Sequence, residues 1–159
     1  EDSRIEFRDS VVQARASAAI THNHPDGIKG AEAVAASVFI ARTGGTRKDI
    51  IDFVESKVGY GLSFDLEELH QSYKSEIQCA YSVPQAIFAF LVSTDFEDAV
   101  RKAIYIGGDS DTLACIAGGI AQAFYKKIPP PLCTGALALL DARLRKVISD
   151  FNKVHGING

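Results

Sequence analysis

The chain has 159 residues, 47% hydrophobic and 23% charged, a balance typical of one soluble globular domain. The net charge of -3 and the absence of any lysine or arginine run disfavour a nucleic-acid partner. No signal peptide is recognisable and no apolar stretch suffices to span a bilayer, so we expect no membrane partner and a cytoplasmic location. Three scattered cysteines predict neither a thiolate zinc site nor a disulfide framework, and Cys115 and Cys133, among apolar residues, are expected to fill the core.

Apolar residues recur with a helical period along the first two thirds of the chain. Helices are expected, in chain order, over residues 5–20, 31–39, 50–58, 65–73, 83–91 and 96–103. Thr46 is a typical N-cap residue for the third of these. Pro84 falls where the first turn of the fifth helix is expected, a position that tolerates proline.

The segment from Leu113 to Phe124 is expected to form the most buried helix, because its apolar stripe is regular and its other faces carry small residues. Gly118 and Gly119 would each cost about 1 kcal/mol relative to alanine in an exposed helix. We therefore expect a neighbouring helix to approach both closely. One long helix is expected after the three prolines, extending to Val154. No segment alternates as a strand does, so the predicted fold class is all-α.

Two aspartates, Asp109 and Asp111, follow a pair of glycines and open the buried helix. They could cap the helix and gain roughly 0.3–1 kcal/mol from its dipole. Two carboxylates about 5 Å apart repel by roughly 3 kcal/mol at an effective dielectric near 20. A divalent cation held by these carboxylates and by Thr112 would remove that repulsion. The residues alone leave both interpretations open. An Asp-x-Asp-x-Thr phosphatase motif is disfavoured, because the threonine spacing differs and no strand precedes.

A loop over residues 21–27 carries the sequence Thr-His-Asn-His-Pro-Asp-Gly between the first two helices. A His-x-His pair can bind zinc in a (β/α)₈ barrel, but that fold needs about 250 residues and alternating strands. Two interpretations remain. The loop is a Pro/Gly turn in which a histidine caps a neighbouring helix end, or it hydrogen-bonds a polyhydroxylated or phosphorylated ligand.

Three motifs occur in a recognisable order: Thr-His-Asn-His-Pro-Asp-Gly-Ile-Lys-Gly-Ala at 21–31, Ser-Val-Pro at 82–84, and Gly-Gly-Asp-Ser-Asp-Thr at 107–112, followed by a small-residue helix at 114–125. In content and order they resemble the ADP-ribosylglycohydrolase family, which includes the dinitrogenase-reductase-activating glycohydrolases and the ADP-ribosyl-acceptor hydrolases. The resemblance covers nearly the whole chain. It implies an all-α fold, a compact orthogonal bundle of many helices.

The resemblance also implies a set of site residues. Asp109, Asp111 and Thr112 match ligands of a centre that holds two Mg²⁺ or Mn²⁺ ions. His22 matches a histidine of the ligand pocket. Tyr81 is a candidate for contact with ADP-ribose, the alternative being an aromatic residue at a helix start that packs on the core.

The chain also departs from the family pattern. Family members carry an N-terminal half with a Gly-Asp-Ala-like opening, a catalytic acidic residue and a Thr-Asp-Asp metal motif, and none of these occurs here. Residues 1–159 are therefore expected to form a single helical domain, the C-terminal part of a longer one, with the catalytic acid outside this chain and an N-terminal segment of the same protein as a partner.

The reaction that the resemblance implies is hydrolysis of the glycosidic bond between ADP-ribose and a modified protein side chain or small-molecule acceptor. In such a reaction ADP-ribose is released, and the enzyme's partner is the ADP-ribosylated protein or small adduct. The alternative is a module without catalysis, which binds ADP-ribose or has a structural, crystallin-like role.

Overall fold

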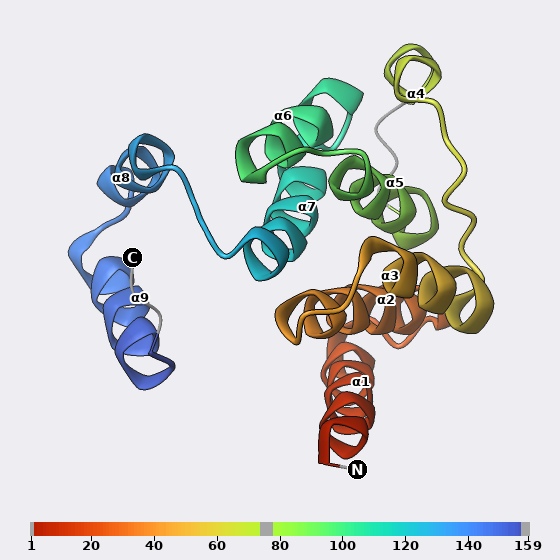
Figure 1. Cartoon of the computed structure of the whole chain (residues 1–159), viewed down its shortest axis with the longest axis horizontal. Helices are drawn as coiled ribbons and strands as arrows, with labels where there is room; N and C mark the ends of the chain where they lie inside the picture. The colour runs from red at the N-terminus through yellow and green to blue at the C-terminus, as the bar shows by residue number, and fades with distance from the viewer. Residues whose placement is uncertain (1, 74–77, 157–159) are drawn as a thin grey trace. The chain divides into compact units, whose positions relative to one another are not determined.

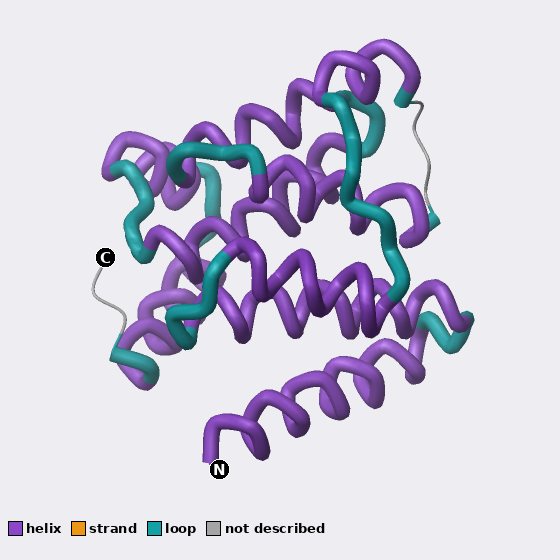
Figure 2. The backbone as a smooth tube through the Cα atoms, turned by 45° about the vertical axis from the view of Figure 1, so that its right-hand side comes forward, coloured by secondary structure: helices purple, strands orange, loops and turns teal. Residues whose placement is uncertain are grey.

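The structure is a computed structural model that describes residues 2–73 and 78–156, with side chains from residue 6 onward. Within these ranges every regular element is a helix (Figures 1 and 2), as the all-α prediction requires. The elements are α1 (Asp2–Thr21), α2 (Pro25–Arg42), α3 (Arg47–Phe53), the π-helix η1 (Val54–Val58), α4 (Leu66–Ser72), α5 (Cys79–Leu91), α6 (Phe96–Ile106), α7 (Ser110–Tyr125), α8 (Pro130–Ala138) and α9 (Ala142–Val154). The chain divides into two compact units, Glu1–Lys126 and Lys127–Gly159. None of the described helices combines the length and the apolar character that crossing a membrane requires.

Side-chain caps fix most of the predicted helix starts. Thr46 caps α3 in a reciprocal capping box: its hydroxyl accepts from the Asp49 amide at 3.2 Å, and the Asp49 carboxylate accepts from the Thr46 amide at 2.7 Å. The prediction for Pro84 was wrong, because α5 begins at Cys79 and Pro84 lies inside it. Proline removes one backbone hydrogen bond there, and the burial of the helix from Ser82 to Phe90 offsets that loss.

The core of the first unit is centred on α7, which packs against α2, α5 and α6. Three residues of its predicted stripe, Leu113, Ala117 and Ile120, are fully buried. They belong to two adjoining apolar clusters: Leu113 and Ala117 share one with side chains of α4, α5 and α6, and Ile120 shares the other with side chains of α2, α3 and α5. The predicted central position of α7 is confirmed.

The two glycines of α7 have different environments. A Cβ at Gly118 would lie 3.4 Å from Val100 of α6, so the expected close approach is found there. At Gly119 the expectation was wrong, because no atom lies within 4 Å of a Cβ built there and the residue is exposed. Cys115 is also exposed and does not fill the core, since it lies on the same outer side of the helix as Gly119, one turn earlier.

The second unit contains two helices where one long helix was expected. Helix α8 ends at Ala138 and α9 begins at Ala142. The carboxylate of Asp141 accepts from the Leu144 amide at 2.8 Å, which makes Asp141 the N-cap of a new helix. A helix-compatible apolar pattern continues across the break, so the pattern alone could not reveal it.

Candidate metal and ligand site

The aspartate loop, residues 107–112, comprises the connection between α6 and α7 and the first residues of α7. Gly107 and Gly108 both have positive φ, 90° and 60°, a backbone region that favours glycine over residues with a side chain. These two residues reverse the chain between the end of α6 and Asp109, the N-cap residue of α7. The glycine pair is therefore what allows Asp109 and Asp111 to stand at the start of a core helix.

Asp109 does not use its carboxylate as other aspartates at helix starts do. Asp65 accepts from two backbone amides of α4 at 2.9 Å. Asp95 and Asp141 each accept from an amide of their own helix at 2.8 Å. The side chain of Asp109, by contrast, makes no capping hydrogen bond to α7. The capping interpretation is thus not borne out for Asp109.

The two carboxyl groups lie within hydrogen-bonding reach of each other. A side-chain hydrogen bond with Asp109 is the largest influence that lowers the pKa of Asp111, followed by hydrogen bonds with the backbone of Thr112 and of Asp111 itself. The Thr112 amide donates to the Asp111 carboxylate at 3.0 Å. Asp111 and Thr112 are exposed, and Asp109 is half-buried. Among residues 2–73 and 78–156, no group of three or more histidine, cysteine or acidic side chains is arranged to hold a metal ion.

The two histidines of residues 21–27, called here the histidine loop, make different contacts. The Nδ1 atom of His24 accepts from the Asp26 amide at 3.2 Å and caps α2, so a histidine does cap a helix, namely the one that it precedes. His22 is exposed, and its Nδ1 atom lies 2.9 Å from the hydroxyl of Thr21. Capping occupies His24, which leaves His22 as the better candidate for ligand contact. Its role stays a prediction.

Tyr81 lies in the first turn of α5 and is 50% exposed. The ring is therefore not buried in the core, and the alternative that it packs on the surface of the core stays open. The next three residues of α5 are buried, so the helix is held firmly while the tyrosine ring faces outward. Contact between this ring and a ligand stays a prediction.

Contacts at the two ends of the central helices show how these segments are arranged. A Cβ at Gly30, near the start of α2, would lie 3.1 Å from Cys79, the first residue of α5. At the other end, the rings of Phe90 and Phe124 lie 5.3 Å apart, near the ends of α5 and α7. Helices α5 and α7 also pack against each other and contribute residues to both apolar clusters. Helix starts carry partial positive charge and free amide groups, which suits an anionic ligand.

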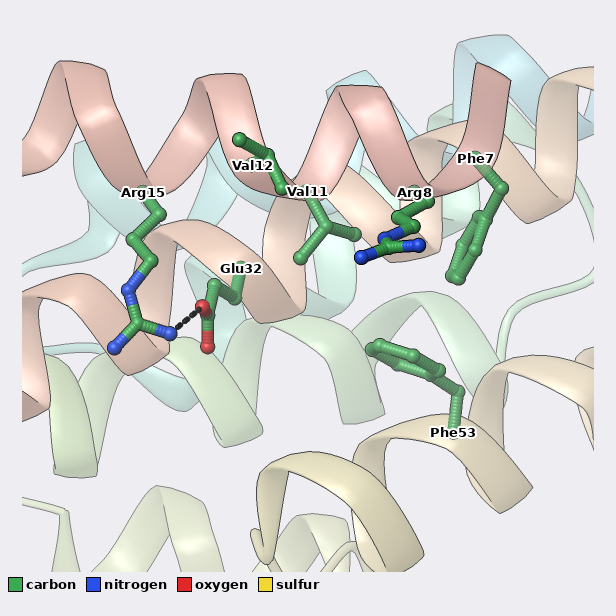
Figure 3. Close-up of a pocket in the computed structure, with 7 residues that line it drawn as sticks. All are labelled: Phe7, Arg8, Val11, Val12, Arg15, Glu32 and Phe53. Atoms are coloured by element: carbon green, nitrogen blue, oxygen red, sulfur yellow. Dashed lines mark hydrogen bonds and ion pairs between the residues drawn. The ribbon is translucent and has the colours of Figure 1, made fainter. Parts of the chain in front are cut away.

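A pocket of about 310 Å³ lies elsewhere, between α1, α2 and α3. Figure 3 shows Phe7 and Phe53 together at one end of it, where their rings meet edge to face with centroids 5.3 Å apart. Its other side is bounded by an ion pair in which Arg15 donates to Glu32 at 2.9 Å. None of the predicted site residues lines this pocket, so it is separate from the aspartate loop.

Sequence reasoning missed the polar contacts that surround these helix ends. Arg47, Ser93 and Tyr125 meet from three separate elements. His70 contacts Tyr105 across 35 residues of sequence. No motif or spacing predicts such pairs, because each residue lies in an ordinary helical or turn context and only the packing brings it to its partner.

The all-helical fold and the loop that presents two adjacent carboxylates define the class of protein. A sequence model of ADP-ribosylglycohydrolases matches residues 5–156. The chain belongs to the ADP-ribosylglycohydrolase family, and the resemblance first drawn from its motifs is confirmed.

Two curated relatives are similar to this chain. An uncharacterized protein of Archaeoglobus fulgidus is 28% identical over 130 residues, which is 73% of this chain and 43% of that protein. ADP-ribosylhydrolase ARH3 of Danio rerio is 34% identical over 74 residues, which is 40% of this chain and 20% of that protein. The matched part thus spans less than half the length of either relative. No solved structure matches the chain significantly.

Proposed function

We propose that this chain supplies one side of a metal-dependent site for hydrolysis of the glycosidic bond between ADP-ribose and an acceptor, with release of ADP-ribose. Family membership supports the reaction class. The observation that carries the assignment to the aspartate loop is the Asp109 carboxylate, which makes no cap to α7 although it stands at the N-cap position. A carboxyl group that does not cap its helix and lies beside a second one fits a binding role.

The residues present fit part of a Mg²⁺ or Mn²⁺ site. Asp109 and Asp111 offer adjacent carboxylates and Thr112 offers a hydroxyl, all hard oxygen donors of the kind that these ions prefer. A bound divalent cation would supply positive charge to orient ribose hydroxyls and a water molecule. The described residues contain no third acidic or histidine ligand beside this pair. The remaining ligands and the catalytic acid are expected from another segment.

The two predicted ligand residues suggest how the substrate is held. The ring of Tyr81 is exposed in the first turn of α5, and the exposed imidazole of His22 lies between the end of α1 and the start of α2. Free amides and the helix dipole at a helix start favour the diphosphate of ADP-ribose. In this arrangement the aspartates would lie at the ribose and the helix starts at the phosphates. Departure of the acceptor would build positive charge on the ribose ring, as in other glycosidases, and the carboxylates would stabilise it.

The test is release of ADP-ribose from ADP-ribosylated arginine and serine peptides by the complete natural protein, with Mg²⁺, with Mn²⁺ and with EDTA. Asp109→Ala and Asp111→Ala should each reduce metal-dependent release by about 100-fold or more, as expected for a lost charge-stabilising group. Asp141→Ala is the matched control: it removes an aspartate from a helix start that caps its helix and should keep the activity. Unchanged turnover in both site variants would refute the assignment.

A second candidate function is binding of ADP-ribose without hydrolysis. The incomplete ligand set among the described residues favours it for this chain by itself. Calorimetric titration with ADP-ribose, together with a release assay on an ADP-ribosylated peptide, separates the two candidates. Binding that is abolished by His22→Ala, with no product released from a modified peptide when metal is present, would favour the binding module.

A further inference from the structure

Helices α4 and α6 are joined by a cluster of three side chains, Glu67, His70 and Tyr105, called here the Tyr105 cluster. His70 Nδ1 lies 2.5 Å from the backbone carbonyl oxygen of Tyr105. The two rings are stacked, with centroids 4.1 Å apart and planes 15° from parallel. The Tyr105 hydroxyl donates to the Glu67 carboxylate at 2.7 Å. One turn of α4 therefore contacts both the backbone and the side chain of Tyr105.

The chemistry of the His70 contact is determined by its partner. A carbonyl oxygen can only accept, so Nδ1 of His70 carries the proton and donates it. Carbonyl groups in the last turn of a helix have no partner within the helix, and Tyr105 is the penultimate residue of α6. The imidazole thus satisfies a carbonyl group that the end of α6 leaves open. The hydrogen bond from Tyr105 is also the largest cause of a lowered pKa of Glu67, as expected for a carboxylate that accepts it.

The position of this cluster links it to the aspartate loop. Tyr105 stands two residues before Gly107, where the loop begins. Ile106, before the loop, and Leu113, after it, are buried in one apolar cluster together with Leu69 of α4. Helix α4 therefore shares an apolar cluster with the residues at both ends of the loop, and it packs against α6 and binds the end of α6 through Tyr105. The loop itself has two glycines with positive φ, and its direction depends on what holds its ends.

We propose that Glu67, His70 and Tyr105 are positioning residues that fix the end of α6 and so set the direction in which the loop presents Asp109 and Asp111. They do not touch the substrate; they act through the backbone of the loop. The inference rests on the proposed function for what the loop binds, while its structural part, the order of the loop, can be measured without any ligand.

The experiment compares His70→Phe and Tyr105→Phe with the wild-type chain by NMR. His70→Phe keeps a stacked ring and removes the donor to the Tyr105 carbonyl; Tyr105→Phe keeps the stack and removes the donor to Glu67. Two readouts are taken. The first is hydrogen exchange of the Gly107 and Leu113 amides, which donate to Ile104 and Asp109 at 3.1 Å. The second is broadening of the loop resonances by Mn²⁺. The matched control is His155→Phe, at another histidine that packs against an aromatic ring, with centroids 4.3 Å apart and planes tilted by 43°.

Both variants should exchange the two amides about threefold to tenfold faster, the factor that one net hydrogen bond represents. They should need about threefold more Mn²⁺ for half-broadening, and His155→Phe should match the wild type. Unchanged exchange in both variants would overturn the proposal, as would faster exchange spread equally over α2 and α5. Absence of Mn²⁺ broadening in the wild type would instead contradict the proposed metal function, and the exchange result would then decide the positioning role alone.

Discussion

The two ends of α7 are built in opposite ways. At its C-terminal end, the Tyr125 hydroxyl donates to the Ser93 carbonyl at 2.8 Å and accepts from Arg47 at 2.7 Å. The Arg47 guanidinium also donates to the Ser93 carbonyl at 2.9 Å and lies 4.8 Å from the ring centroid of Phe124. At the N-terminal end, the Asp109 carboxylate caps nothing.

This difference shows which end contributes to stability and which is available for binding. Polar groups that bind each other away from water lower the free energy of the folded state, and they have no capacity left for a ligand. Carboxylates that face each other raise that free energy unless a cation or proton lies between them. We therefore expect substitutions at the C-terminal end to change stability, and substitutions at the aspartate loop to change binding.

Arg47→Met should produce the largest loss of stability, roughly 2–3 kcal/mol of unfolding free energy, because it removes a charged donor from two acceptors while keeping an apolar stem. Urea unfolding followed by far-ultraviolet circular dichroism measures it. The control is Arg101→Met, whose arginine pairs with Glu97 on the surface of α6 and should cost less than about 1 kcal/mol. Equal losses of unfolding free energy in the two variants would show that the Arg47 contacts stabilise the protein no more than a surface ion pair does.

Tyr125→Phe should cost about 1–2 kcal/mol, because the lost hydroxyl leaves Arg47 and Ser93 each without one hydrogen-bond partner in a half-buried site. The same urea titration measures it. Tyr81→Phe removes the hydroxyl of a half-exposed tyrosine and should leave the unfolding midpoint unchanged. A loss of similar size in Tyr81→Phe would contradict the contrast drawn between the two ends of the central helices.

Asp95→Ala and Asp109→Ala test the contrast between a capping and a non-capping aspartate directly. Asp95 accepts from the Asp98 amide, so its removal should cost about 1 kcal/mol. Asp109 makes no capping hydrogen bond to α7, so its removal should cost less than about 0.5 kcal/mol, below the loss of a cap. Thermal unfolding in EDTA compares the two. If Asp109→Ala lost as much stability as Asp95→Ala, the interpretation of Asp109 as a helix cap would be restored.

The smallest change in stability is expected for Asp98→Asn, and this change depends on pH. Its hydrogen bond with Lys102 is the main cause that holds the pKa of its carboxyl below the ordinary 3.8. A lowered folded pKa stabilises the protein above about pH 3.8, and this contribution is lost as the pH falls through the folded value. The difference in urea midpoint between wild type and Asp98→Asn should therefore shrink from neutral pH to about pH 2. Asp150→Asn, at an exposed pair with Lys146, should show little difference at either pH.

Local sequence was sufficient for much of the fold. The helical period located α2, α6 and α7, and Thr46 was correctly predicted as a cap because capping depends on residues within one turn. The break before α9 and the extension of α5 across Pro84 were missed. In both places the apolar period continues. Where the helix begins depends instead on a side-chain cap or on burial, and neither can be inferred from the period.

In the aspartate loop, too, some features follow from the local sequence and others from tertiary packing. The sequence by itself determined that two carboxylates and a threonine follow a glycine pair at the start of a core helix, and its motif order pointed to the family that was then confirmed. Only the tertiary structure decided that Asp109 is not used as a cap and that His70 of α4 holds the end of α6 beside it. The physical reason is distance along the chain. Dihedral preferences and caps act within a few residues, whereas the partners of a side chain are chosen by how helices far apart in sequence pack together.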